Sequence, residues 1–156
     1  MRSTPEKNQG FTLIELIIAM AIIAVLARIA IPAYMESVRK AKRSQAQVAV
    51  TGLAQSLERY FTNCNSYNST TAPCTASINA SNVPTIYPPN VPQSGTAFYT
   101  LTVVIPAGGA SYTITAAPVS GGQMAGDKCG SFTYTSDGAK GLSGQTTGVV
   151  VTDCWK

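Results

Sequence analysis

Four cysteines are the residues best suited to covalent chemistry in this chain: Cys64, Cys74, Cys129 and Cys154. None of them forms a Cys-x-x-Cys pair, and the sequence contains no histidine, so no zinc site is expected. An even number of cysteines behind an apolar N-terminal segment predicts disulfides formed in an oxidising compartment. The economical pairing joins cysteines that are close in the sequence, so that each bond closes a local loop: Cys64–Cys74 and Cys129–Cys154. Buried free thiols are the alternative.

Side chains for catalysis are sparse. The absence of histidine removes the commonest general base and the commonest metal ligand. The sequence also lacks a GxSxG motif and a glycine-rich phosphate loop, and its seven carboxylates are scattered. We therefore expect no catalytic residues, no metal and no cofactor, and we expect that the protein is not an enzyme.

A carboxylate, Glu15, stands near the start of an apolar run from Phe11 to Ala33. Those 23 residues would form a helix about 35 Å long, which is enough to cross a bilayer. A carboxylate in hydrocarbon costs on the order of a few kcal/mol and is usually paired. The nearest basic residues, Lys7 and Arg28, lie eight residues before Glu15 and thirteen after it, so no cation is within helical reach.

Cleavage of the chain between Gly10 and Phe11 would supply a partner for Glu15. The new α-amino group would lie four residues before the carboxylate, and the two charges could pair within one subunit or, with better geometry, between neighbours in an assembly. Glu15 would then set the register of stacked subunits, because it would be unpaired in a lone subunit. The alternative is a carboxylate that reaches the membrane interface.

A secretory signal peptide is the other interpretation of the apolar run. Its longest uncharged part, residues 16–27, has 12 residues, a length that a signal peptide also has. Two features argue against this interpretation. The run continues into a helical pattern, and the nearby glycine lies before the run rather than after it.

One long helix must position these groups. Beyond the apolar run, apolar residues recur at spacings of three and four, which predicts an amphipathic helix with a single apolar stripe. The stripe consists of Ala46, Val50, Leu53, Leu57 and Tyr60 or Phe61. Together with the apolar run, this pattern predicts a helix over residues 11 to about 62, about 78 Å long, with a kink or local opening at Pro32.

The remaining residues predict a small antiparallel sheet. Residues 64–97 are rich in Asn, Ser, Thr and Pro, which is typical of an irregular surface loop. Alternating apolar and polar residues predict strands at 99–105, 112–116 and around 132–134. Residues 149–151 either extend the sheet or line it. The expected fold class is α+β, with one long N-terminal helix packed against an antiparallel sheet of three to four strands.

The net charge of +4 is concentrated near the N-terminus. A basic cluster follows the apolar run: Arg39, Lys40, Lys42 and Arg43. Such a cluster contacts anionic headgroups, forms a solvated helix face, or pairs with an acidic residue of a neighbouring subunit such as Glu36. After the cluster there are four basic and four acidic residues, so the C-terminal part is neutral.

Three lysines of this C-terminal part are candidates for DNA contact: Lys128, Lys140 and Lys156. A DNA-binding head needs a basic stripe that neutralises phosphates. Since this head is neutral, DNA is a less favoured partner.

The N-terminal motif resembles that of type IV pilins. Residues 10–15 read GFTLIE and residues 29–34 read IAIPAY, which is similar to the class III signal and N-terminal helix of that family. The resemblance implies that a prepilin peptidase cuts after Gly10 and methylates the new N-terminal Phe11. It also implies that Glu15 contacts a neighbouring subunit's N-terminus during assembly. Arg28 departs from the family, which usually has a small apolar residue there.

The C-terminal residues resemble those of PilE-type minor pilins and related competence pilins. This similarity covers residues 127–134, 137–141 and 153–156. In pilins, the loop that the bond Cys129–Cys154 would close is the variable, exposed region that contacts partners. The resemblance divides the chain into five parts. They are a leader (1–10), a membrane or filament-core helix half (11–34), an amphipathic helix half (35–62), an irregular loop (63–97), and a sheet with the C-terminal disulfide loop (98–156).

The resemblance implies a structural subunit of a type IV pilus, a minor or major pilin that supports twitching motility, adhesion or DNA uptake. Its partners would be other pilin subunits, the prepilin peptidase and the inner-membrane assembly platform. It would reside in the bacterial inner membrane before assembly and in the extracellular pilus afterwards. The alternatives are a type II secretion pseudopilin, which the C-terminal disulfide loop disfavours, and a DNA-uptake receptor pilin.

Overall fold

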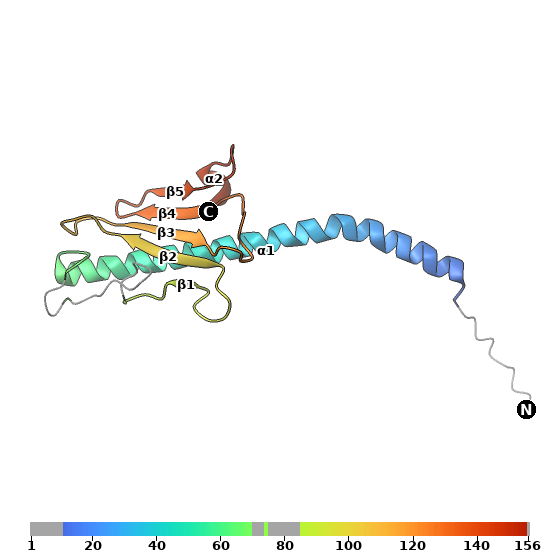
Figure 1. Cartoon of the computed structure of the whole chain (residues 1–156), viewed down its shortest axis with the longest axis horizontal. Coiled ribbons are helices and arrows are strands. Elements are labelled where there is room, and N and C mark those ends of the chain that lie inside the picture. The colour runs from blue at the N-terminus through green and yellow to red at the C-terminus, as the bar shows by residue number, and fades with distance from the viewer. Residues whose placement is uncertain (1–10, 70–73, 75–84, 156) are drawn as a thin grey trace, which may run out of the picture. The chain divides into compact units, whose positions relative to one another are not determined.

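The computed structural model describes residues 11–69, 74 and 85–155 (Figure 1). The predicted leader, with Gly10 of the cleavage site, and the candidate DNA contact Lys156 lie outside the described residues. The chain divides into two compact units, Met1–Val38 and Arg39–Lys156. Helix α1 (Leu13–Cys64) contributes residues to both, and each unit is described by itself.

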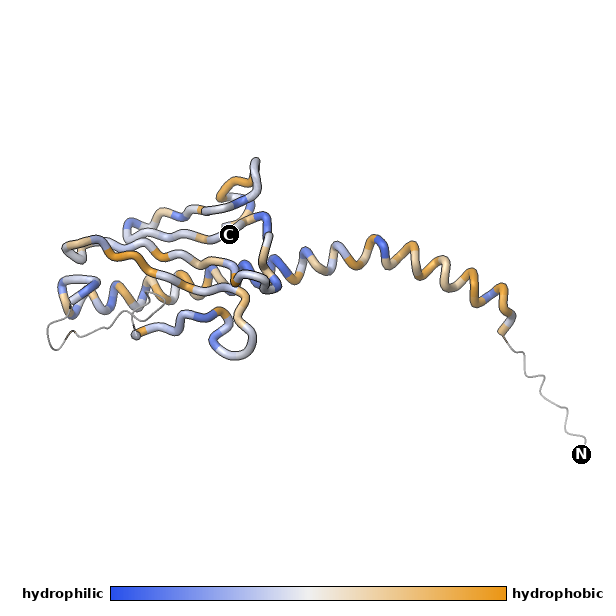
Figure 2. The backbone as a smooth tube through the Cα atoms, in the orientation of Figure 1, coloured by the Kyte–Doolittle hydropathy of each residue, from blue (hydrophilic) through white to orange (hydrophobic). Residues whose placement is uncertain are grey.

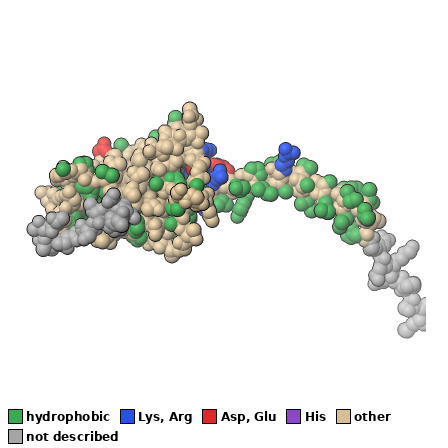
Figure 3. All heavy atoms as spheres, viewed as in Figure 1, with side chains coloured by type: hydrophobic (Ala, Val, Ile, Leu, Met, Phe, Trp, Pro, Cys, Tyr) green, Lys and Arg blue, Asp and Glu red, His purple; other side chains and the backbone are tan. Residues whose placement is uncertain are grey.

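The described part of the first unit is an apolar helix with its side chains exposed. Phe11 is 83% exposed and Ile29 is 70% exposed. Figure 2 shows the hydrophobic colouring of the backbone along this stretch of α1, and Figure 3 shows its apolar side chains. By length and composition alone, α1 is suited to cross a membrane. The helix continues through Pro32, without the local opening that the sequence suggested, since proline removes a single hydrogen bond from a helix of 52 residues.

In the second unit, the predicted apolar stripe is the buried face of α1. Ala46, Val50, Leu53 and Leu57 are fully buried, and the partly buried Phe61 packs against the same core. Residues three and four apart share one helix face, which explains why the stripe is continuous. The helix ends at Cys64.

The sheet of the second unit is an antiparallel meander in the order β1-β2-β3-β4-β5 (Figure 1). Its strands are β1 (Asn90–Val91), β2 (Tyr99–Val104), β3 (Thr113–Pro118), β4 (Ser131–Thr135) and β5 (Lys140–Ser143). Five strands exceed the expected three to four because β1 has two residues and β5 has one large apolar side chain, Leu142, so neither shows an alternating pattern. Val151 begins the short helix α2 (Val151–Cys154) and does not extend the sheet; Val149 and Val151 are partly buried against the core, in agreement with the lining alternative.

The strand register brings the apolar residues onto one face of the sheet. Leu101 pairs with Ala116, and Ala116 pairs with Phe132, so three neighbouring strands place buried side chains side by side. These residues and the stripe of α1 form one hydrophobic core. The predicted hairpin is confirmed, with its turn closed by a 3.1 Å hydrogen bond from Gly109 N–H to Pro106 O.

The chain after α1 returns against this hairpin turn. The bond Cys64–Cys74 has a Cα–Cα distance of 5.7 Å, and Tyr67 N–H donates to Gly109 O at 2.8 Å. Gly109 has a φ of 65°, and a Cβ there would lie 2.1 Å from Ser66 Oγ. Glycine is therefore required at this close approach.

Glu58 links α1, the loop that follows it and the residue that precedes β3. Its carboxylate accepts hydrogen bonds from Tyr67 Oη at 3.0 Å and from Tyr112 Oη at 2.9 Å. Burial, followed by the hydrogen bond to Glu58 and the negative charge of that carboxylate, raises the pKa of Tyr67 from 10.0 to about 12. The pKa of Tyr112 is raised by the same causes. Both phenols therefore remain protonated hydrogen-bond donors at neutral pH.

We predict that Glu58→Gln lowers the pKa of Tyr67 from about 12 toward 10.0, because the substitution removes the negative charge beside the phenol. NMR of carbon-labelled tyrosine during a pH titration measures this change. Since the folded pKa exceeds the unfolded one, the stability that Tyr67 contributes is complete below pH 10.0 and is lost as the pH rises through about 12. Asp137→Asn, which removes an exposed carboxylate, is the control, and an unchanged Tyr67 pKa in Glu58→Gln would contradict the assignment.

Candidate functional site

The start of α1, in the first unit, holds Glu15 in a reciprocal capping box with Thr12. Thr12 donates to Glu15 Oε2 from its backbone N–H at 3.2 Å and from its hydroxyl at 3.0 Å. In return, Glu15 N–H donates to Thr12 Oγ1 at 3.4 Å. Two of the backbone donors that a helix start leaves without partners are thereby satisfied.

The capping box adds local hydrogen bonds that the sequence-based expectation for Glu15 did not include. The sequence predicts a carboxylate without a cation in a lone subunit, and in the structure this carboxylate accepts two hydrogen bonds from neutral donors of Thr12. The signal was readable as Thr-x-x-Glu at residues 12–15, followed by an apolar run. The assembly role of Glu15 and the processing of Phe11 stay predictions.

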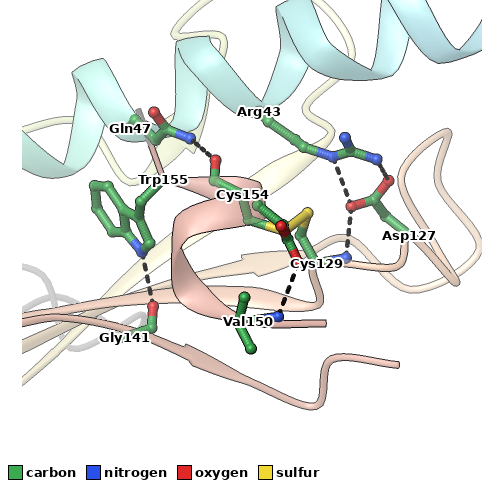
Figure 4. Close-up of a disulfide and its surroundings, with 9 residues drawn as sticks. Arg43, Gln47, Asp127, Cys129, Gly141, Val150, Cys154 and Trp155 are labelled. Carbon is green, nitrogen blue, oxygen red and sulfur yellow. Dashed lines mark hydrogen bonds and ion pairs between the residues drawn. A yellow bond between two sulfur atoms is a disulfide. The ribbon is translucent and has the colours of Figure 1, made fainter. Parts of the chain in front are cut away.

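A buried ion pair joins α1 to the loop before β4 in the second unit. Arg43 Nε lies 2.9 Å from Asp127 Oδ1, and Arg43 Nη2 lies 2.6 Å from Asp127 Oδ2 (Figure 4). Arg43 is 4% exposed and Asp127 is 5% exposed. Asp127 Oδ1 also accepts a hydrogen bond from Cys129 N–H at 3.1 Å. The carboxylate thus connects the helix to a disulfide-bonded residue.

This ion pair corrects the expectation for the basic cluster. Arg43 is not available to headgroups, solvent or a neighbour, because its guanidinium forms a bidentate pair inside its own head. Lys42 also binds within the head, where its Nζ donates to Gln123 and lies 5.6 Å from the ring centroid of Phe98. A sequence signal existed for Arg43: it lies three residues before Ala46 and therefore on the apolar stripe.

The C-terminal disulfide loop is tied to both α1 and the sheet. Cys129 and Cys154 are bonded, with a Cα–Cα distance of 5.9 Å, so both disulfides of the structure have the pairs that the local-loop argument favours. Gln47 Nε2 donates to Cys154 O at 2.6 Å, and Trp155 Nε1 donates to Gly141 O of β5 at 2.8 Å. Figure 4 shows these contacts around the disulfide.

The structure does not bring the two described lysines of the DNA candidate set together. Lys140 is exposed at the start of β5, with Nζ 5.3 Å from the ring centroid of Trp155. Lys128 is exposed and lies three residues before Ser131. Ser131 pairs with Ser143, which is the last residue of β5, whereas Lys140 is its first residue. The length of β5, about 10 Å, therefore separates the two positions.

Lys128 instead lines a cavity with the basic cluster of α1. The cavity has a volume of about 350 Å³. Its lining comprises Lys40, Arg43, Ser44, Gln47, Lys128, Val149, Asp153 and Cys154. We call it the Lys40–Lys128 cavity. Sequence reasoning missed it because the two lysines are 88 residues apart and come together only in the folded head.

We predict that Arg43→Leu lowers the unfolding free energy by about 3 to 5 kcal/mol, because it leaves the carboxylate of Asp127 buried without its cation. Chemical denaturation of the full chain in detergent measures the change. Arg59→Leu, at an exposed arginine of the same helix, is the control and should change stability by about 0.5 kcal/mol or less. The double variant Arg43→Leu/Asp127→Leu should recover most of the loss. Equal effects of Arg43→Leu and Arg59→Leu would show that the pair does not hold the loop.

Two family models match this chain. Residues 32–133 match "Type IV minor pilin ComP, DNA uptake sequence receptor", which is well over half of the sequence. Residues 6–30 match "Prokaryotic N-terminal methylation motif". The second match covers Gly10, Phe11 and Glu15, and the first covers α1 from Pro32 onward, strands β1 to β3 and the first part of β4.

Curated relatives are type IV pilins. The chain is 39% identical over 62 residues to the type IV major pilin protein PilA of Myxococcus xanthus, a match that covers 40% of this chain and 28% of that one. It is 49% identical over 50 residues to a fimbrial protein of Moraxella nonliquefaciens, covering 32% of each. It is 39% identical over 56 residues to PilE1 of Neisseria gonorrhoeae, covering 36% of this chain and 34% of that one. The chain therefore matches about a third of the length of these relatives.

Among solved structures, a type IV pilin from Shewanella oneidensis is similar with a TM-score of 0.46 and 19% identity, covering 75% of this chain and 97% of that one. A likeness at this level carries no argument about function. The family assignment rests on the family model, which confirms the pilin resemblance of the sequence. This chain belongs to the type IV pilins, in the family described as type IV minor pilin ComP, DNA uptake sequence receptor.

Proposed function

We propose that this protein is a structural subunit of a type IV pilus, a minor pilin that assembles through its N-terminal helix and catalyses no reaction. The observation that carries the proposal is the exposed apolar surface of the first unit. Its large side chains from Phe11 to Met35 are each more than half exposed, from Met35 at 51% to Phe11 at 83%. A continuous apolar helix surface must be covered by lipid or by other helices.

The methylation motif supports a route into the filament. A prepilin peptidase cuts between Gly10 and Phe11, and Phe11 is methylated. The subunit waits in the inner membrane, is taken up by the assembly platform, and then becomes part of the extracellular pilus. The amine of one subunit pairs with Glu15 of another, so that Glu15 exchanges part of its contact with Thr12 for a contact between subunits.

We predict that Glu15→Ala is processed and inserted in the membrane but is absent from sheared filaments, because it lacks the charge that pairs with a neighbour's amine. Immunoblots of membrane and filament fractions measure this, and the intact mass reports loss of the first ten residues. Glu15→Gln is the informative companion, because glutamine keeps a capping acceptor and removes the charge. Filaments with normal amounts of Glu15→Gln would mean that the cap, not the charge, is what assembly needs.

A second role in DNA uptake is supported by the family that matches residues 32–133, whose description names a DNA uptake sequence receptor. We propose that the head contacts DNA through Lys128, Lys140 and Lys156. Lys128 and Lys140 are exposed, and Lys140 adjoins the indole of Trp155. In the sequence, residues 39–155 include seven basic and four acidic residues, so this part carries a net positive charge that the part after Arg43 lacks. The family describes a pilin, which leaves the pseudopilin alternative without support.

We predict that the full chain in detergent shifts duplex DNA at low salt. Lys128→Gln and Lys140→Gln should each weaken the shift and reduce the slope of log affinity against log salt by about one. Lys42→Gln is the matched control, since it removes the same charge from a lysine of the head outside the proposed contact set, one that binds Gln123 and Phe98. No shift at low salt would remove the DNA role while leaving the pilus role intact.

A further inference from the structure

The apolar stretch of α1 in the first unit carries two opposite charges. Arg28 is exposed, and no hydrogen bond or ion pair joins it to the described residues. Glu15 is exposed too, and Thr12 directs both of its donors to Oε2, so Oε1 has no partner within the described part of the chain. Glu36, the third charged residue among residues 11–38, already takes part in an interaction. Arg28 and Glu15 therefore remain for contacts with another molecule.

The spacing of the two charges is set by the helix that carries both. Arg28 follows Glu15 by thirteen residues, which is about 20 Å along the helix axis and about 140° around it. The two side chains thus leave the helix on nearly opposite sides and at different heights. They cannot pair with each other, and each meets a different neighbour when the helix is covered on all sides.

The surroundings of Arg28 change between the proposed membrane state and the proposed filament. In the membrane, Arg28 lies about 26 Å along the helix from Phe11, close to the thickness of about 30 Å of the hydrocarbon core, so its long side chain reaches the headgroups. In a filament, neighbouring helices replace the lipid. A guanidinium between apolar helices then needs an acidic partner, because an unpaired buried charge is costly.

We infer that Arg28 of one subunit pairs with Glu15 of a second copy of this chain in the assembled filament. The guanidinium binds Oε1, and Oε2 is shared by Thr12 and the α-amine of the proposed assembly contact. A carboxylate has enough acceptor positions for both cations. This inference rests on the proposed role as a pilus subunit and adds to it the alignment of neighbouring copies.

The pair between Arg28 and Glu15 determines both the displacement of the copies and the type of contact. Helices that enter from the same side of a membrane are parallel, so the pair displaces the two copies by about 20 Å along the helix axis. Each copy joins one neighbour through Glu15 and another through Arg28, because these side chains lie on opposite sides. Such a head-to-tail contact with an axial displacement does not close on itself and produces an open stack.

Cysteine cross-linking in sheared filaments tests this displacement. Ile22 follows Glu15 by seven residues and Met35 follows Arg28 by seven, so two helical turns return each to nearly the face of its charged residue. Both side chains are more than half exposed, and the structure has no free cysteine. Cells that produce Ile22→Cys and Met35→Cys together should form a cross-link between residues 22 and 35. Cells that produce Ile22→Cys alone are the matched control and should form none, because the displacement keeps identical positions apart.

Substitution of Arg28 tests whether its charge causes this alignment. Arg28→Leu should lower the cross-link and the ratio of filament to membrane protein by about tenfold or more, because it truncates one partner of a buried charge pair. Arg28→Lys keeps the cation and should keep most of both signals. Arg59→Leu, which removes an exposed arginine from the same helix in the second unit, is the control and should change neither.

Three results would overturn the inference. The first is a higher filament ratio in Arg28→Leu, which is expected if the guanidinium is buried without a partner. The second is a cross-link in Ile22→Cys alone as strong as that between residues 22 and 35. The third is the presence of both cysteine variants in filaments without a cross-link, which would assign Arg28 to a different subunit or to lipid. Absence of the wild type from sheared filaments would instead refute the pilus role itself.

Discussion

The bidentate contact between Arg43 and Asp127 is the constraint around which the head is arranged. A buried ion pair contributes little net stability, because desolvation offsets much of the attraction, but its two parallel hydrogen bonds demand one geometry. Here they determine the rotation of α1 against the loop before β4, since a turned helix would leave a buried charge unpaired. Asp127 also accepts from Cys129 N–H, so the same carboxylate orients the residue that carries the C-terminal disulfide.

Polar contacts bracket the apolar stripe of α1 at both ends. Arg43 lies at the start of the stripe, three residues before Ala46, and Glu58 lies fifteen residues after Arg43, about 22 Å along the helix. Between these two residues the stripe buries nonpolar surface, and this hydrophobic contribution does not depend on the direction of the contacts. At the Glu58 end, two tyrosine hydroxyls from different segments converge on one carboxylate. Hydrophobic packing therefore holds helix and sheet together, while the two polar ends define the position of one against the other.

Periodicity in the sequence was sufficient for much of this architecture. The three- and four-residue spacing of Ala46, Val50, Leu53 and Leu57 identifies the buried face of α1, and strict alternation identifies β2 and β3. Strand β1 could not be found this way, because two residues are too few to show a period, and its pairing with β2 exists only in the folded chain.

The same distinction between local patterns and long-range contacts applies to the candidate sites. The capping box of Thr12 and Glu15 is a local pattern that the sequence alone can predict. The position of Arg43 on the stripe indicates that its side chain is buried, but the sequence does not identify its partner Asp127, which lies 84 residues away. The Lys40–Lys128 cavity was not available, because its lining is brought together by the ion pair, the disulfide and α2. Long-range polar contacts have no period that a single sequence can show.

The closing contacts of the head come late in the chain. Cys154 supplies the second sulfur of the disulfide and a carbonyl for Gln47, and Trp155 packs its ring against Phe132 at 5.3 Å between centroids. The helix and the first hairpin therefore precede these residues in the sequence, and one edge of the core stays open until Cys154 and Trp155 are in place. Oxidation of Cys129 and Cys154 thus joins the two segments that complete this edge, so maturation of the head depends on the redox state of its surroundings as well as on packing.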